Sequence, residues 1–126
     1  MDKVLDTPFV HYQLNDDLLT ATYKKGLKIS LDMAKDIVKS RLELTNHRPL
    51  LVLVYNQGVV SMEKKARDYL SSNEGVSEII AAAIVLDSPF GSFLGNFFIS
   101  VTKPKIPARI FSKREDALKW LQKFRK

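Results

Sequence analysis

The feature that most constrains the fold is an uninterrupted apolar run from Leu50 to Tyr55, which is followed at once by a polar loop that contains a glycine. The run does not alternate between apolar and polar residues, and this is typical of a strand that is buried on both faces. In open α/β sheets, ligands and switches usually lie where the chain leaves the carboxyl end of such a strand. We therefore expect the functional residues in and around the loop after Tyr55.

Similar patterns elsewhere predict an alternation of strands and helices. The run from Ile79 to Leu86 predicts a second central strand, and apolar residues from Phe90 to Val101 recur at the spacing of an amphipathic helix. The expected elements, in chain order, are strands over 9–14 and 18–23, a helix from Ser30 to about Leu44, a strand over 50–55, a helix capped by Ser61, a strand over 79–86, a helix over 90–101, an edge strand over 108–111 and a last helix after Ser112. This order places the chain in the α/β class.

Composition narrows the class of protein. With 126 residues, of which 45% are apolar and 27% are charged, the chain is typical of one globular domain, and we expect a single domain over 1–126. The absence of cysteine excludes disulfides, thiolate catalysis and cysteine-based zinc sites. No secretory signal is visible, and the longest apolar run is far shorter than the roughly 20 residues of a membrane-spanning helix. We expect a cytoplasmic protein.

Positive charge is concentrated at the carboxyl-terminal end. Residues 103–126 contain nine Lys and Arg against only Glu115 and Asp116, whereas the whole chain has a net charge of +6. Such an end could follow phosphates or an anionic membrane surface. A solvated helix face with cations near the helix terminus accounts for the same pattern. The polar face carries no interleaved aromatic residues, and this argues against nucleic acid as the partner.

Polar residues follow both central strands, and they form the candidate binding site. If the two strands are adjacent and parallel, the loops at their carboxyl ends converge and can bind a polar ligand or a partner. Turn and cap chemistry, with Ser61 and Ser88 as helix caps, explains the same residues without a ligand. The candidate ligand- or partner-binding residues are Tyr55, Asn56, Gln57, Gly58, Ser61, Asp87, Ser88 and Asn96.

Catalysis is not expected from these residues. A nucleophilic serine needs a base within hydrogen-bond reach, and the two histidines, His11 and His47, lie far from the serines of the strand-end loops. No pair of carboxylates has a spacing that suggests acid–base work, and no set of metal ligands is present. We therefore expect a protein that is not an enzyme and has no cofactor or metal.

The expected helix over 90–101 contains two glycines, Gly91 and Gly95, four residues apart. Glycine inside a helix costs up to about 1 kcal/mol relative to alanine, so some contact should offset it. Close packing on the alanine-rich strand, a partner helix in a dimer and a bound ligand are the three explanations. We expect a homodimer whose interface includes Gly91, Gly95, Asn96 and Ile99.

The order of elements resembles the SpoIIAA-like, or STAS, fold of anti-sigma-factor antagonists and transporter tails. Several segments are also similar to an uncharacterised bacterial family with that fold, namely residues 31–36, 65–69, 95–98, 110–112 and 117–121. The resemblance spans nearly the whole chain. It implies a mixed α+β arrangement, in which one mixed sheet of about five strands has helices packed on one face.

The resemblance also implies a role for the loop after Tyr55. In the antagonists this loop reads Asp-x-Ser-Gly, and its serine accepts phosphate. The matching residues here are Tyr55-Asn56-Gln57-Gly58, so Gln57 replaces the phosphoacceptor serine. The resemblance therefore implies a non-enzymatic, cytoplasmic interaction or regulatory domain with a regulatory protein partner and without that phosphorylation switch.

A small-ligand or lipid-binding module is the alternative function. The resemblance also extends to lipid carriers, whose cavity between sheet and helices holds an apolar ligand. Seven phenylalanines, among them Phe93, Phe97 and Phe98, could line such a cavity or fill a solid core. We expect a solid core, because a ligand-sized void would remove much of the packing that stabilises so small a domain.

Overall fold

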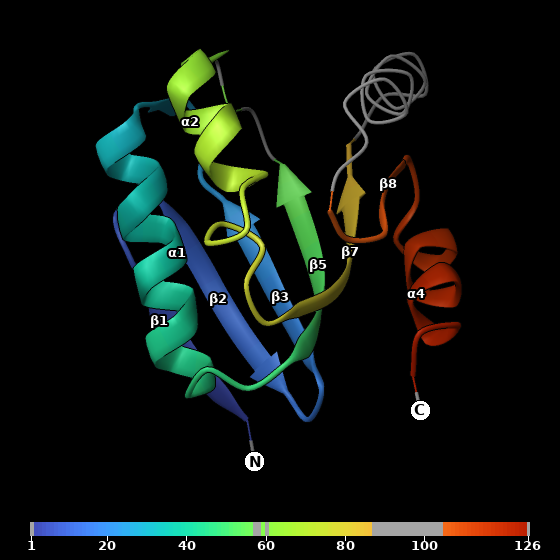
Figure 1. Ribbon diagram of the computed structural model, residues 1–126. Coiled ribbons are helices and arrows are strands. Elements are labelled where there is room, and N and C mark those ends of the chain that lie inside the picture. The colour runs from blue at the N-terminus through green and yellow to red at the C-terminus, as the bar shows by residue number, and fades with distance from the viewer. Residues whose placement is uncertain (1, 57–58, 60, 87–104, 126) are drawn as a thin grey trace.

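The computed structural model describes residues 2–56, 59, 61–86 and 105–125, and a six-stranded sheet lies at its centre (Figure 1). The strands are β1 (Lys3–Asp6), β2 (Val10–Asn15), β3 (Leu18–Tyr23), β5 (Leu50–Asn56), β7 (Ile79–Val85) and β8 (Ala108–Phe111), in that spatial order. The pairs β1–β2 and β2–β3 are antiparallel, whereas β3, β5, β7 and β8 run parallel to one another. The sheet is therefore mixed, and β5 and β7 are adjacent and parallel, which meets the condition for their carboxyl-end loops to converge.

Three described helices and a second, small sheet complete the described part of the chain. The helices are α1 (Leu31–Thr45), α2 (Lys64–Leu70) and α4 (Arg114–Gln122), and the small sheet pairs β4 (Lys28–Ile29) with β6 (Ser61–Met62). This short pairing joins the start of α1 to the start of α2, whose apolar side chains share a cluster formed by Ile29, Ala34 and Ala66.

The limits of α1 follow from local chemistry. The Ser30 hydroxyl accepts a hydrogen bond from the Met33 amide at 3.2 Å and caps the amino end. Asn46 has a φ of 54°, a left-handed conformation that asparagine tolerates and that commonly ends a helix. The predicted helix from Ser30 to about Leu44 is thus confirmed to within one residue.

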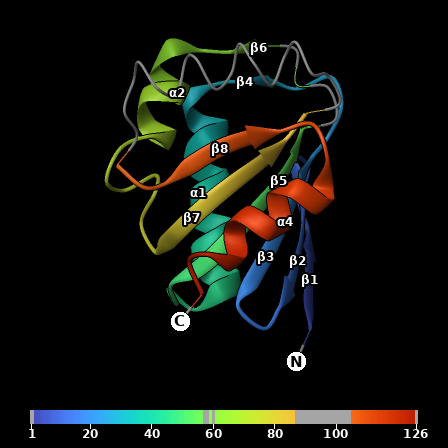
Figure 2. The same ribbon diagram turned by 90° about the vertical axis from the view of Figure 1, so that its right-hand side faces the viewer.

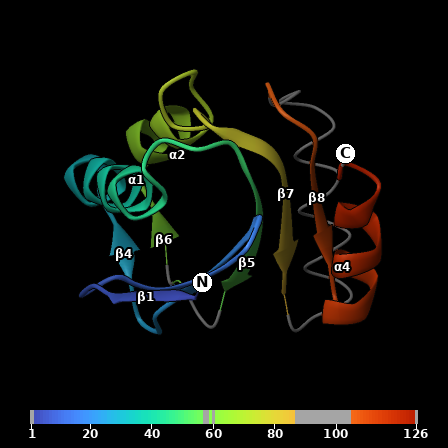
Figure 3. The same ribbon diagram turned by 90° about the horizontal axis from the view of Figure 1, so that it is seen from below.

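The sheet carries helices on both faces, because successive strand residues point in opposite directions. α1 and α2 cover one face, where Val52 and Ala82 lie. α4 packs on the other face against Leu51, Leu53, Ala81 and Ala83. Figures 2 and 3 show the two layers on either side of the sheet. The expectation that the helices pack on one face is therefore wrong, since β5 and β7 bury apolar side chains in both directions.

Other differences from the sequence-based expectations concern short elements. The sheet has six strands rather than about five, because β1 pairs with β2 at the edge. Ser61 does not cap α2, because it pairs with Lys28 in the small sheet. Glu63 occupies the cap position, but its side chain accepts a hydrogen bond from the Leu31 amide and does not cap α2. The predicted hairpin, both central strands and the edge strand over 108–111 are confirmed.

The expected helix over 90–101 falls outside the residues that the structure describes. Within residues 2–56, 59, 61–86 and 105–125, no helix has the length and apolar character needed to cross a membrane.

Candidate functional site

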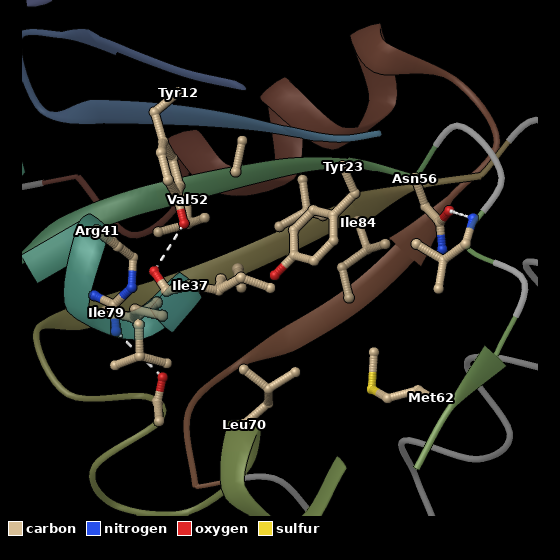
Figure 4. A pocket seen from close by; sticks show the side chains of 16 residues that line it. Tyr12, Tyr23, Ile37, Arg41, Val52, Asn56, Met62, Leu70, Ile79 and Ile84 are labelled. Carbon is tan, nitrogen blue, oxygen red and sulfur yellow. Dashed lines mark hydrogen bonds between the residues drawn. The ribbon is translucent and has the colours of Figure 1, made fainter. Parts of the chain in front are cut away.

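A cavity of about 250 Å³ lies between the sheet and the layer formed by α1 and α2 (Figure 4). It extends along the strands, from the start of β7 to the end of β5. Most of its lining is aliphatic, with a few polar groups. The lining residues are Tyr12, Ala21, Tyr23, Ile37, Val38, Arg41, Val52, Val54, Asn56, Val59, Met62, Leu70, Gly75, Ile79, Ala82 and Ile84.

The cavity exists because small and β-branched side chains meet there. Ala21 and Ala82 leave space above the sheet, and Val52 and Val54 are too short to fill it. The expectation of a solid core is therefore wrong for this layer. The opposite face of the sheet does have a solid core, because Leu53 and Ala83 are fully buried beneath α4. Phe93, Phe97 and Phe98 lie outside the described residues.

Three polar side chains on the cavity wall act on one another, and we refer to Tyr12, Tyr23 and Arg41 as the Tyr–Arg cluster. The Tyr12 side chain is 1% exposed, and its hydroxyl donates a hydrogen bond to the Ile37 carbonyl at 2.9 Å. The Tyr23 ring lies along the cavity, and its hydroxyl points away from Asn56 toward the side on which Arg41 lies (Figure 4). The cluster therefore brings two phenols and a cation into an otherwise apolar space.

Arg41 connects the cavity to the turn between α2 and β7. Its guanidinium donates to the Ser77 carbonyl at 2.9 Å and to the Gly75 carbonyl at 3.2 Å. The residue is only 6% exposed. Burial lowers the pKa of the Arg41 guanidinium, while Tyr12, Tyr23 and Glu78 act in the opposite direction. Burying a cation costs free energy unless a partner offsets it, so the groups around Arg41 affect which ligands the cavity can bind.

The two phenols hold their protons more tightly than free tyrosine does. Burial raises the pKa of Tyr23 to about 12. Burial also raises the pKa of Tyr12, and the neighbouring Tyr23 adds to the rise. Both groups are therefore neutral hydrogen-bond donors over the physiological pH range.

These shifts predict a loss of stability in alkali. Because the folded-state pKa of Tyr23 lies above the ordinary value of 10.0, the contribution of the neutral phenol is complete below about pH 10 and is lost as the pH rises toward 12. A titration that follows the near-ultraviolet absorbance of phenolate should show Tyr12 and Tyr23 ionising late. Tyr23→Phe should remove one late-ionising group and raise the pH at which the protein unfolds. Ionisation of both residues near pH 10 in the folded protein would contradict this.

The predicted site residues that the structure describes do not share one surface. Asn56 lines the cavity, and its side-chain oxygen accepts a hydrogen bond from the Val59 amide at 3.0 Å, so it also shapes the turn. Tyr55 points to the opposite face, toward the α4 cluster. Ser61 is exposed in β6. Gln57, Gly58, Asp87, Ser88, Gly91, Gly95, Asn96 and Ile99 lie outside the described residues, so the partner surface and the dimer interface stay predictions.

The Tyr–Arg cluster does not follow from any motif in the sequence, although one signal is present. Arg41 lies seven residues after Ala34 and four after Ile37, so it falls on the apolar stripe of α1. A charged residue on a stripe that faces the core needs a buried partner or a special role. Tyr12 and Tyr23 gave no comparable signal, because aromatic residues are ordinary in strands.

The described residues hold no cluster of three or more His, Asp or Glu side chains suited to a metal ion. His11 forms an exposed pair with Asp6 at 3.0 Å on the β1–β2 edge. His47 follows the end of α1. Neither histidine lines the cavity.

Comparison with known proteins identifies the family of this chain. A family model described as "Domain of unknown function (DUF7793)" matches residues 12–125. The chain belongs to this family. Among solved structures it is similar to the crystal structure of an uncharacterized protein of the DUF3478 family with a SpoIIAA-like fold, from Shewanella loihica PV-4. No curated protein matches the sequence.

The likeness to the Shewanella protein concerns the fold alone. The two chains share 14% sequence identity with a TM-score of 0.59, and the match covers 96% of this chain and 95% of that chain. Together with the mixed sheet, this confirms the SpoIIAA-like fold that the sequence resemblance implied. Function must then be argued from the site, because one fold serves many functions.

Proposed function

We propose that this member of the DUF7793 family is a non-enzymatic module that binds a small, mostly apolar ligand between its sheet and α1 and α2. The observation that carries the proposal is the cavity of about 250 Å³ with its largely aliphatic lining. An engineered apolar cavity of about 150 Å³ holds benzene, and pockets for drug-sized ligands start near 300 Å³. The cavity therefore suits a molecule larger than one aromatic ring and smaller than a two-chain lipid.

The lining supports binding rather than catalysis. Its described residues include no histidine, carboxylate or serine, so this part of the lining provides no general base and no nucleophile with a base beside it. The neutral tyrosines and the arginine can orient a polar group of a ligand.

The interaction or regulatory role implied by the fold resemblance concerns the same end of the sheet. Asn56 belongs both to the cavity wall and to the predicted partner surface. A ligand in contact with Asn56 could change the turn to Val59, which Asn56 holds through its hydrogen bond. We propose that partner binding there depends on the ligand rather than on phosphorylation, since Gln57 stands in the phosphoacceptor position.

Two neighbouring alanines of β7 provide a test that needs no knowledge of the natural ligand. Ala82→Leu places new methyl groups in the cavity, so the free energy of unfolding should change by less than about 1 kcal/mol while binding of octan-1-ol is lost. Ala83→Leu is the matched control: it overpacks the filled α4 face and should cost about 1–3 kcal/mol while binding is retained. Urea unfolding and nuclear magnetic resonance titration measure the two quantities.

The opposite pattern would contradict the proposal. If Ala82→Leu destabilised the protein as much as Ala83→Leu, the space above β7 would be filled in solution. If octan-1-ol did not bind the unsubstituted protein at all, the cavity would not serve as a site for an apolar ligand of this size.

A further inference from the structure

Within the described part of the chain, no opposite charge lies close to the Arg41 cation at one end of the cavity. Among the residues that the structure describes, no carboxylate forms an ion pair with Arg41, and Glu78 acts on its charge only from a longer distance. The hydrogen bonds to the Ser77 and Gly75 carbonyls use only part of the donor capacity of the guanidinium. A buried cation without an anion is unfavourable, so an anionic group that enters the cavity gains a strong partner.

The second observation that favours an anionic ligand concerns the Tyr23 hydroxyl. The described part of the chain provides it with no hydrogen-bond partner, although Tyr23 packs against the core cluster that contains Ile37 and lines the cavity. Tyr23 is only partly buried, so its hydroxyl lies on the cavity wall where a ligand can reach it. A ligand oxygen placed between this hydroxyl and Arg41 would accept a hydrogen bond from each.

Among the described lining residues, none at the opposite end of the cavity carries a charge. Val59, Met62 and Ile84 line it, and the polar group there, Asn56, is engaged by the Val59 amide. The cavity thus has a polar end and an apolar end, which is the pattern that an amphiphile with one small head group requires.

From this juxtaposition we propose that the ligand is a single-chain fatty carboxylate, with its carboxylate held by Arg41 and the Tyr23 hydroxyl and its tail lying toward Met62 and Ile84. A carboxylate matches the planar fork of a guanidinium and can also accept a hydrogen bond from a phenol. The volume of about 250 Å³ admits one short chain and not a two-chain phospholipid. This inference rests on the proposed function and adds the class of ligand.

A purely structural role for Arg41 is the main alternative. Its two carbonyl contacts hold the turn between α2 and β7, and such contacts alone could explain its position. The two roles differ in what they predict for the choice among ligands, because a residue that only holds a turn does not distinguish a carboxylate from an alcohol of the same length.

The test compares octanoate, octan-1-ol and octylamine at the same pH and ionic strength, by calorimetry and nuclear magnetic resonance titration of the full chain. Octanoate should bind at least about tenfold more tightly than octan-1-ol, because a charged hydrogen bond contributes more than a neutral one, and octylamine should not bind. Arg41→Met should make octanoate and octan-1-ol bind equally. Arg48→Met, at an exposed arginine away from the cavity, should change nothing.

Tyr23→Phe keeps the test decisive if Arg41→Met fails to fold. It removes only a hydroxyl with no described partner, so the fold should be retained while the preference for octanoate falls several-fold. Tyr55→Phe, on the opposite face of the sheet, is its matched control. Equal binding of octanoate and octan-1-ol by the unsubstituted protein would overturn the carboxylate inference and leave the proposed function standing. Binding of neither compound would overturn both.

Discussion

Gly75→Ala is expected to destabilise the protein by about 3 kcal/mol or more, because the backbone leaves no room for a side chain at this position. A Cβ atom there would lie 2.8 Å from both the carbonyl carbon and the Cα of Leu70, and it would also collide with the Tyr69 carbonyl oxygen. These are backbone atoms at the end of α2, so a flexible side chain cannot move aside to relieve the contact. The turn would have to move.

Gly26→Ala is the control for this substitution. Gly26 has a φ of +78° and no atom within 4 Å of the added Cβ, so the change costs only the strain of a left-handed alanine, about 1–2 kcal/mol. Urea unfolding curves of both variants, compared at equal slope, give the two losses of free energy. Equal losses would show that the close approach at Gly75 does not exist in solution.

The Gly75 position also links the fold to the candidate site. Its carbonyl accepts a hydrogen bond from Arg41, so any displacement of the turn moves one of the two contacts that hold the guanidinium. The tight turn after α2 therefore helps to build the cavity wall, because its carbonyls hold the Arg41 cation, which has no carboxylate partner in the described part of the chain.

The central features of the fold were predictable from local patterns. The apolar run over 50–55 and its neighbour over 79–86 became adjacent parallel strands, since long runs without polar alternation have few other solutions. Ser30 predicted the start of α1 because its cap depends on residues only three positions away.

Features that depend on long-range pairing were not predictable. β1 has four residues and is held by β2, and β4 and β6 have two residues each, too few to show a period. Ser61 has the chemistry of a cap, yet its pairing with Lys28 places it in a strand before α2 begins. At such positions, strand pairing in the folded protein determines the local structure, and the intrinsic preference of the residue does not.

The candidate site was also not predictable from the sequence, for a different physical reason. Its walls come from β2, β3, α1, β5, β6, α2 and β7, so no single segment carries a motif. A void is a property of side chains that are too small, and alanine and valine look the same in sequence whether or not a neighbour fills the space beside them. The position of Arg41 on an apolar stripe was the one local sign.

One face of β5 packs under α4 and contributes to stability, whereas the other face borders the cavity proposed to bind a ligand. Leu53→Ala tests whether these two roles are separate. Leu53 is 0% exposed and packs beneath α4, so the substitution should cost about 2–5 kcal/mol, from lost burial and from the new cavity that remains. The removed atoms do not border the cavity under α1 and α2. Binding of octan-1-ol to the folded fraction should therefore be unchanged.

Val54→Ala, one residue further along the strand, is the matched opposite case. Val54 borders the cavity, so its methyl groups already lack neighbours on one side, and their loss should cost only about 1 kcal/mol. Removing them enlarges the cavity and should change the affinity for octan-1-ol, which Leu53→Ala leaves alone. Urea unfolding and ligand titration of both variants measure the two effects. Equal losses of stability would mean that the side of the sheet under α1 and α2 is filled in solution. A change of affinity in Leu53→Ala alone would mean that octan-1-ol binds under α4.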